Sequence, residues 1–571
     1  MPLSSLKGRQ LMLCDVIYQR GSKKTDWKDF LNIVYRDMVT GKKEVFTIKE
    51  PTIDIFVVKD EYIDFKKPRH FIERDKVDVK TVKYKDVLWE IAKIGGEGTM
   101  NFYKSHSMKE RRELYKYPYV FGADIPIETY YRCLWNEQVG NCDKVNLHKA
   151  FLDIEVDQIN FEGNIAKDGE CPVNAVTIID DETDISYTFL YDDGNNPQIK
   201  DFVNNQEAFQ KRVHEEFDDK YGVLTYKIYM FDNELEMLIQ IFRLIKTICP
   251  DFVLIWNMGY DIPYLESRIR RLGVNPESIM CDKAFPTESL YYYRDTKSFE
   301  WADKRDSFTI SSKTHYSDQL INYAALRKSQ DTVKRVNLDY IGKKEGVSDG
   351  KVGYSDVATI RTLPYVDYIL FVIYNIGDVL LQRGIERKVK DVNNLYLITT
   401  TNNIGYTDAL KQTVTFRGLM YTYLKKIGYV LGHNTNFGNE THGKYDENGD
   451  RLETDEEDEG FEGAINGDPM LNMENGIEIF GAISRFLYKF VIDFDFSSMY
   501  PNSIVAFNIF ATTLIGKLYI LGVELKNPYD KDMGKEYIED IIAGDMNHIG
   551  AKWHNLSPIE KLAQKIKSAY F

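Results

Sequence analysis

Cysteine is scarce in this chain, since only six of its 571 residues are cysteine. No two cysteines are spaced as C-x-x-C, so the sequence has neither a pair of zinc ligands nor the pattern of a disulfide framework. We therefore expect reduced thiols in a cytoplasmic protein.

Long apolar runs are also missing. No uninterrupted apolar stretch approaches the roughly 20 residues of a membrane-spanning helix. The N-terminal residues lack the apolar core that precedes the cleavage site of a signal peptide. The sequence thus predicts a cytoplasmic protein without a membrane segment.

Excess positive charge is absent, because the formal net charge is −15. This balance argues against a protein that binds nucleic acid over its whole surface, although it allows DNA binding in one local groove. Much of the acid lies in residues 445–459, which contain nine acidic residues and one arginine. Like charges repel one another, so we expect this segment to form a solvated, flexible loop.

Hydrophobic residues make up 43% and aromatic residues 13% of the chain, enough for several packed cores. At the usual domain size, this length corresponds to about three or four domains. Residues 1–147 show short strand patterns, such as EVFTIKE and TIDIFVV, and predict a mixed domain. From residue 148 onward strands alternate with helices, which indicates an α/β domain, and a further α/β piece follows the acidic loop.

The α/β region begins with three strand patterns, HKAFLDIEVDQ, NAVTIIDD and SYTFLYDD. Apolar spacing predicts a helix over 234–247, and DFVLIWN then indicates a buried strand. The next segment, DIPYLESRIRRLG, predicts a helix that starts near Pro263. Another long apolar helix is predicted over 364–385.

Asp153 and Glu155 stand two residues apart on the first predicted strand. Side chains alternate between the two faces of a strand, so both carboxylates point to one side. Two acids directed at one point repel unless a cation lies between them, and hard oxygen ligands suit Mg²⁺ or Mn²⁺. For this short pattern alone, a polar strand face exposed to water is the simpler explanation.

Three further residues strengthen the hypothesis of a metal site. Asp261 stands where a buried strand passes into a helix, and Tyr374 and Asp378 share one face of a predicted helix. Tyr374 alone is explained as an ordinary core tyrosine, and Asp378 alone as a partly buried, hydrogen-bonded acid. Together, the carboxylates can hold two divalent ions that bind a phosphodiester and lower the pKa of a water, which the tyrosine hydroxyl orients.

The order of three segments carries a resemblance to a known family. DIEV, then NMGYDIPYL, then YNIGD resemble the three exonuclease motifs of family B DNA polymerases. FGADIPIETYY resembles the approach to the first motif, and SDQLINY resembles part of the segment between the second and third. The resemblance implies a ribonuclease-H-like α/β fold and the removal of mismatched nucleotides from the 3′ end of DNA.

The same resemblance implies a role for individual residues. The positions that match metal ligands of the family are Asp153, Glu155, Asp261 and Asp378, and Tyr374 matches the residue that positions the water. Asn257 matches the asparagine of the second motif. It stands four residues before Asp261, where many members have five, so the role of Asn257 is left open.

DFSSMYP, residues 495–501, resembles the first palm motif of these polymerases, and FEGAINGDP is similar to the strand before it. Asp495 ends an apolar strand, so its carboxylate can reach a metal, while backbone N–H groups of the following turn can meet phosphate oxygens. The ring of Tyr500 would lie under the sugar of an incoming nucleotide. The predicted nucleotide-binding residues are Phe496, Ser497, Ser498, Met499 and Tyr500.

Two motifs of a complete polymerase site do not occur in the sequence. These are the second acidic palm motif, Y-x-D-T-D-S, and the fingers motif, K-x-x-x-N-S-x-Y-G. YYYRDTKS, residues 291–298, resembles the acidic motif but lies between the second and third exonuclease motifs, so we expect a surface β-hairpin or loop there. The resemblance covers essentially the whole chain and corresponds to the N-terminal part of a replicative polymerase of large tailed bacteriophages.

From this resemblance we predict a multi-domain α/β protein. An N-terminal mixed α+β domain would occupy residues 1–147 and be completed by about 390–428, the ribonuclease-H-like exonuclease would occupy 148–389, and an incomplete α+β palm would occupy 429–571. The main hypothesis is the N-terminal subunit of a split DNA polymerase. A second polypeptide would then supply the fingers, the thumb and the rest of the palm.

The resemblance also implies cofactors and partners. We expect two Mg²⁺ (or Mn²⁺) ions in the exonuclease site, and two in the polymerase site once the second polypeptide is bound. Expected partners are single-stranded and primer–template DNA, deoxynucleoside triphosphates and, through the second polypeptide, a sliding clamp, in the host cytoplasm if the protein is viral. The alternatives are a stand-alone 3′→5′ exonuclease with a vestigial palm, a non-catalytic DNA-binding or assembly subunit, and a fragment of a longer polymerase.

Overall fold

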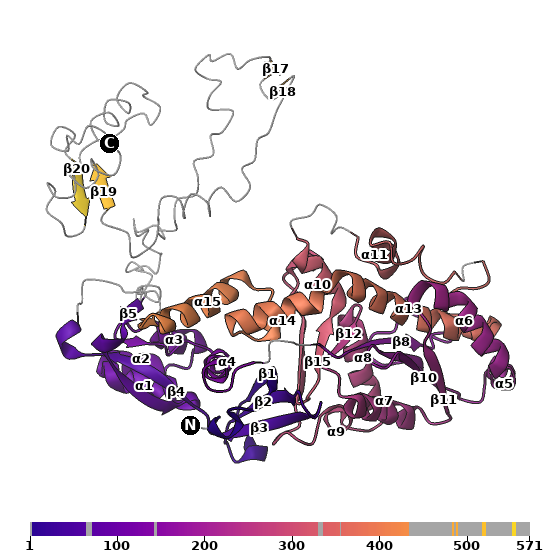
Figure 1. The fold of residues 1–571 in the computed structure, drawn as a ribbon, viewed down its shortest axis with the longest axis horizontal. Helices are drawn as coiled ribbons and strands as arrows, with labels where there is room; N and C mark the ends of the chain where they lie inside the picture. Colours follow the sequence, from indigo (N-terminus) through magenta and orange to yellow (C-terminus); the bar gives the residue numbers. More distant parts are fainter. Residues whose placement is uncertain are drawn as a thin grey trace, which may run out of the picture. The chain divides into compact units, whose positions relative to one another are not determined.

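In the computed structural model, the chain divides into two compact units, Met1–Glu453 and Thr454–Phe571 (Figure 1). The structure describes residues 3–432 apart from 64–70, 142–145, 329–334 and 354–355. Beyond residue 432 it describes four short strands: β17 (Ala482–Ser484), β18 (Leu487–Tyr488), β19 (Lys517–Ile520) and β20 (Ala551–His554). β17 pairs with β18 and β19 with β20, both antiparallel.

The N-terminal part of the first unit contains two antiparallel three-stranded sheets. One has the order β1-β2-β3 and the other β6-β4-β7. The strands and helices here are β1 (Leu11–Gln19), β2 (Phe30–Asp37), β3 (Lys43–Lys49), β4 (Thr52–Val58), β6 (Val77–Lys83), β7 (Val120–Phe121), α1 (Val87–Gly95), α2 (Glu97–Lys104), α3 (Met108–Glu113) and α4 (Ile127–Gln138). Their common core includes Leu31, Ile55 and Trp135. β3 and β4 confirm the two strands predicted in this region.

A six-stranded mixed sheet follows. Its strands are β8 (Lys149–Val156), β9 (Val173–Asp180), β10 (Ile185–Tyr191), β11 (Thr225–Phe231), β12 (Phe252–Ile255) and β15 (His315–Asp318). They are ordered β11-β10-β9-β8-β12-β15, and only β9 runs antiparallel to its neighbours. The predicted α/β fold class is confirmed, as are the strands predicted over β8, β9, β10 and β12.

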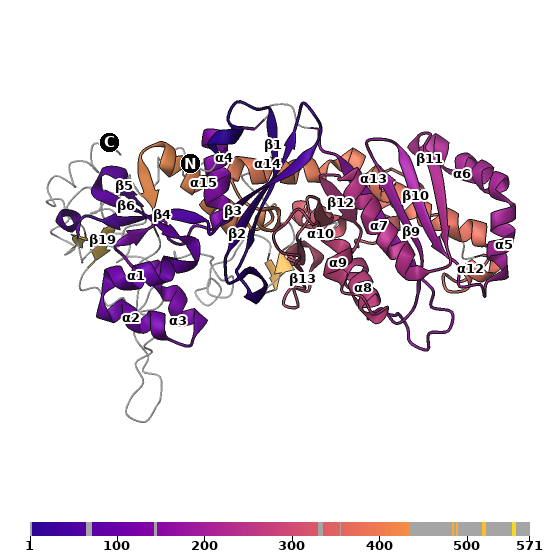
Figure 2. The same cartoon turned by 90° about the horizontal axis from the view of Figure 1, so that it is seen from below.

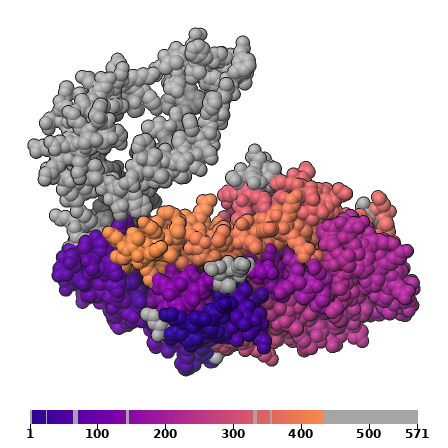
Figure 3. All heavy atoms as spheres, in the orientation of Figure 1, coloured from indigo at the N-terminus to yellow at the C-terminus, as the bar shows by residue number. Residues whose placement is uncertain are grey.

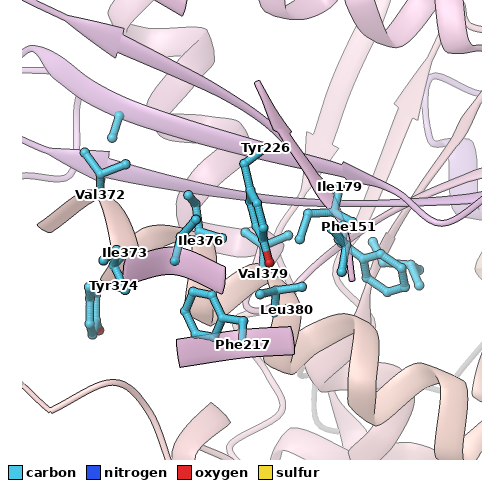
Figure 4. Close-up of a cluster of buried hydrophobic side chains, with 14 of the residues drawn as sticks. Phe151, Ile179, Phe217, Tyr226, Val372, Ile373, Tyr374, Ile376, Val379 and Leu380 are labelled. Atoms are coloured by element: carbon cyan, nitrogen blue, oxygen red, sulfur yellow. The ribbon is translucent and has the colours of Figure 1, made fainter. Parts of the chain in front are cut away.

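Helices cover both faces of this sheet (Figures 1 and 2). The helices of this region are α5 (Pro197–Asn204), α6 (Gln206–Tyr221), α7 (Glu234–Ile248), α8 (Met258–Arg271), α9 (Pro276–Met280), α10 (Gln319–Leu326), α11 (Leu338–Lys344), α12 (Leu363–Val366) and α13 (Tyr368–Val389). On one face, Phe151 and Ile179 pack in a core with Leu380 of α13 (Figure 4). On the other face, Leu152 packs in a core with Leu265 of α8. Neighbouring strand residues point to opposite faces, so the pleat of β8 separates the two cores.

The helix predicted over 364–385 is in fact two helices, α12 and α13. Asp367 has extended backbone angles between them, and its carboxylate accepts the N–H of Leu370 at 2.8 Å. This cap gives α13 a start of its own. α13 is long and apolar enough to cross a membrane, but 89% of its most apolar window is buried inside the protein, as is typical of a core helix.

The start of α8 also differs from the prediction, because the helix begins at Met258 and includes Pro263 in its interior. Proline has no N–H to donate to the carbonyl of Gly259, four residues earlier. Arg294 donates to that carbonyl at 2.6 Å instead. This substitute donor lets the helix begin early enough to hold Asp261 in its first turn.

The segment after α13 contacts the N-terminal part of the chain. It contains α14 (Asp391–Asn402), α15 (Gln412–Lys426) and β16 (Tyr429–Leu431), which pairs with β5 (Phe71–Glu73). Asn136 donates to Asn403 at 2.7 Å, and Lys425 pairs with Glu137 at 2.7 Å. In the space-filling view, the orange residues of this segment lie beside indigo and purple N-terminal residues (Figure 3). The domain boundaries at 147, 389 and 429 remain predictions.

The segment YYYRDTKS lies in an exposed β-hairpin. β13 (Leu290–Tyr293) pairs antiparallel with β14 (Ser307–Ile310). Tyr291 and Tyr293 of β13 are 65% and 43% exposed. The expected surface hairpin is therefore confirmed, and the acid of this segment does not belong to a polymerase palm strand.

Candidate active site

Asp153 and Glu155 lie on β8, on the face that α13 covers. In the register of the sheet, Asp153 is opposite Thr177 of β9 and Glu155 is opposite Ala175. The intervening Ile154 belongs to the core on the other face. Both carboxylates share one face, as their two-residue spacing predicts.

α13 supplies the next two residues, Tyr374 and Asp378, which lie one helical turn apart. Carboxylate oxygens of Asp153, Glu155 and Asp378 all lie within 4.8 Å of one another. The Tyr374 hydroxyl forms a hydrogen bond with Asp378. Packing α13 on the sheet thus joins residues of the first and third predicted motifs in one group.

Asp261 lies beside this group, in the first turn of α8. It is only 4% exposed. Burial, followed by the charge on Asp153, raises the pKa of Asp261 well above its usual value, and Glu155 contributes to the same effect. The structure therefore brings the predicted residue of the second motif into electrostatic contact with the acids of the first.

Burial and mutual repulsion raise the pKa of the other carboxyl groups as well. Burial, followed by the charge on Asp378, raises the pKa of Asp153 to about 7. Burial, followed by the charges on Asp153 and Asp378, raises the pKa of Glu155 well above its usual value. Burial also raises the pKa of Asp378 itself. Such a cluster keeps its full negative charge only when positive charge is close by.

Lys351 supplies one positive charge, and the sequence patterns did not single it out. Its ammonium group pairs with Asp378 and donates to the Tyr374 hydroxyl at 3.1 Å. Burial opposes the charge on Lys351, but the nearby carboxylates of Asp378, Asp153 and Glu155 together favour the charge and raise the pKa of the lysine. No local spacing rule links a loop lysine to acids on α13, so only the folded chain reveals the contact.

The cluster suits a hard divalent cation. The three grouped residues offer carboxylate oxygens, the ligands that Mg²⁺ and Mn²⁺ prefer. Asp378 Oδ1 is buried and has no hydrogen-bond partner among the described residues. Burying an unpartnered carboxylate oxygen is costly, so this atom is well placed as a ligand. The residues present therefore fit a divalent cation.

Two further residues are related to Asp261, one by its place in the sequence and one by its charge. Asn257 precedes α8 in the left-handed conformation, with φ 67°, and its carbonyl accepts the N–H of Tyr260 at 2.9 Å. Asp318, at the end of β15, is a buried carboxyl that the sequence patterns did not identify; it accepts the N–H of Ile321 at 3.1 Å. Burial raises the pKa of Asp318 to about 7. Asp318 in turn raises the pKa of Asp261.

The predicted palm residues and the acidic segment 445–459 lie outside the residues that the structure describes. The palm positions concerned are Asp495, Phe496, Ser497, Ser498, Met499 and Tyr500. Their assignment to a metal and nucleotide site stays a prediction.

The structure thus combines a six-stranded α/β domain with a carboxylate group that could hold divalent cations. Residues 165–307 match the family model described as DNA polymerase family B, exonuclease domain. The matched residues include Asp261, while Asp153 and Glu155 precede them and Asp378 follows them. No curated protein matches the chain. The match supports an exonuclease domain of the family B DNA polymerase type in this part of the chain.

Proposed function

We propose that this protein is a proofreading-type 3′→5′ DNA exonuclease that uses two divalent cations. The observation that carries the proposal is the group of carboxylate oxygens within 4.8 Å of one another, supplied by Asp153, Glu155 and Asp378. The family match over residues 165–307 supports a nuclease that acts on DNA.

We assign a role in this reaction to each residue of the cluster. Asp153, Glu155, Asp261 and Asp378 would hold Mg²⁺ or Mn²⁺. When bound, two such ions lower the pKa of the attacking water and stabilise the leaving oxygen of a phosphodiester. The Tyr374 hydroxyl accepts from Lys351 at 3.1 Å and bonds to Asp378, so it is held at the cluster to orient the attacking water.

Digestion of 5′-labelled single-stranded DNA by the purified full-length protein tests this function. We expect a ladder of products shortened from the 3′ end in Mg²⁺ and no digestion in EDTA. Asp378→Asn should lower the rate by at least about 100-fold, because it removes a metal-binding charge. Asp219→Asn, at an exposed position on α6, is the matched control and should retain the wild-type rate. Digestion that Asp378→Asn leaves unchanged would refute the proposal.

We further propose that DFSSMYP is the first palm motif of a polymerase site that a second polypeptide completes. The support is the motif itself, together with the lack of the second acidic motif and the fingers motif among the 571 residues. Asp495 would hold cations, and residues 496–500 would bind the incoming nucleotide. Primer–template DNA, deoxynucleoside triphosphates and, through the second polypeptide, a sliding clamp would be the partners.

Co-expression with products of the neighbouring coding sequences tests this second proposal. Primer extension that needs both chains and is lost in Asp495→Ala would support it. If no mixture extends a primer and Asp495→Ala changes nothing, the protein is a stand-alone exonuclease with a vestigial palm. If the protein binds DNA but shows no Mg²⁺-dependent digestion, it is instead a non-catalytic assembly subunit. A reading frame that continues past residue 571 would identify the chain as a fragment of a longer polymerase.

A further inference from the structure

A row of polar side chains crosses the sheet beneath α13. In the register of the strands, Asp153 of β8 is opposite Thr177 of β9, which is opposite Thr188 of β10. Both threonines are 0% exposed and lie on a sheet face that is otherwise packed with apolar residues such as Phe151 and Ile179. Polar groups in such a place are costly unless they are hydrogen-bonded.

Asn375 of α13 completes a hydrogen-bond chain with this row. The Thr177 and Thr188 hydroxyl oxygens are 2.9 Å apart, and Thr177 donates to Asn375 Oδ1 at 2.6 Å. The amide nitrogen of Asn375 donates to Asp153 Oδ2 at 3.2 Å. Asn375 itself is 0% exposed, so water does not compete for these contacts.

The number of hydroxyl protons gives this series of hydrogen bonds a single direction. A threonine hydroxyl carries one proton, and Thr177 donates its proton to Asn375. Thr188 must therefore be the donor in the bond between the two threonines. Because the Thr177 hydroxyl faces the amide oxygen of Asn375, the amide N–H₂ group has to face Asp153. The series of hydrogen bonds thus presents a donor, rather than an acceptor, to the Asp153 carboxylate.

We propose that Thr177 and Asn375 are positioning residues for the cation site, acting through Asp153. The amide N–H of Asn375 donates to Asp153 Oδ2. The carboxylate is therefore held in one rotamer, and Oδ1 is left to coordinate a cation. Partners of this kind behind a metal ligand typically contribute 10- to 100-fold to metal affinity. The inference rests on the proposed function, since it assigns Asp153 as a ligand.

Mn²⁺ binding by the full-length protein, followed by electron paramagnetic resonance, tests this inference. Only the part of the Mn²⁺ binding that Asp378→Asn removes is attributed to the cluster, and this part is compared between the variants. We expect Thr177→Val to weaken this component about tenfold and to lower kcat for DNA digestion with KM unchanged. Thr177→Ser keeps the hydroxyl and should restore both values. Thr399→Val, at another fully buried threonine whose hydroxyl donates to the backbone carbonyl of Tyr396 at 2.8 Å, is the matched control.

Each outcome decides the inference. A folded Thr177→Val protein with wild-type Mn²⁺ affinity overturns it, as does a Thr177→Ser protein that behaves like Thr177→Val. If Thr177→Val fails to fold, Thr188→Val replaces it and should weaken Mn²⁺ binding about threefold. Wild-type Mn²⁺ affinity in Thr188→Val would likewise overturn the inference. Wild-type protein that binds Mn²⁺ but leaves DNA intact refutes the exonuclease alone, whereas absence of Mn²⁺ binding refutes both proposals.

Discussion

Replacing Asp153 with asparagine is expected to stabilise the protein in the absence of divalent cations. Asparagine has nearly the shape of aspartate, and its side-chain oxygen can still accept the N–H of Asn375. It lacks the charge that burial and Asp378 disfavour. Asp153→Asn therefore removes the repulsion and keeps the packing.

The size and sign of this effect follow from the pKa of Asp153. Folding raises this pKa from 3.8 to about 7. One pKa unit corresponds to about 1.4 kcal/mol, so ionised Asp153 lowers the free energy of unfolding by up to about 4 kcal/mol. Asp153 keeps some contact with solvent and shares the repulsion with its neighbours, so we expect about 2 kcal/mol at alkaline pH.

The pH dependence identifies the cause. The folded state binds the Asp153 proton more tightly than the unfolded state, so this contribution to stability is complete below about pH 4 and is lost as the pH rises to about 7. Wild type should therefore lose stability over this range in EDTA, and Asp153→Asn should lose less. The two proteins should be equally stable in acid.

Urea unfolding in EDTA at acidic and alkaline pH measures this difference. Asp219→Asn on α6 is the control and should change the free energy of unfolding by less than about 0.5 kcal/mol. Excess Mg²⁺ should reverse the order, because a ligand at 100 times its Kd stabilises the wild type by about 2.7 kcal/mol. A difference between the proteins that does not change with pH would refute the reasoning.

Three further predictions concern other residues. Tyr374→Phe should lower kcat on single-stranded DNA by about 10- to 100-fold with KM little changed, because the attacking water loses its orienting group; single-turnover digestion measures this. Lys351→Met removes the cation that lowers the pKa of Asp378, so the pH-dependent loss of stability in EDTA should move to higher pH, which pH-resolved unfolding detects. Asp251→Ala leaves Lys43, whose side chain is 1% exposed, without its carboxylate partner, and urea unfolding should show a loss of about 3–5 kcal/mol.

Local patterns in the sequence predicted the strands and helices that form the site. The alternation of apolar and acidic residues in FLDIEV predicted β8 and the common face of Asp153 and Glu155, because strand side chains have a period of two. The four-residue spacing placed Tyr374 and Asp378 on one face of α13. Each pattern lies within a single strand or helix, where the backbone geometry alone decides to which side a side chain points.

The local rules failed where one side-chain hydrogen bond replaced a general propensity. Proline normally marks a helix start, yet Pro263 lies inside α8, because Arg294 satisfies the carbonyl that the proline leaves without a donor. The break before α13 was missed because Asp367 looks like any other polar residue in an apolar run, although its carboxylate caps the helix. In each case a hydrogen bond outweighs a general propensity.

By itself, the sequence determined which acids share a face and that their chemistry suits a hard cation, since these properties belong to residue types at fixed spacings. Only the tertiary structure decided which acids meet, that Lys351 pairs with Asp378, and that Thr177 turns the amide of Asn375 toward Asp153. The physical reason is that hydrogen bonds and charge pairs act over a few ångströms in space, and the packing of α13 on the sheet decides which side chains come that close.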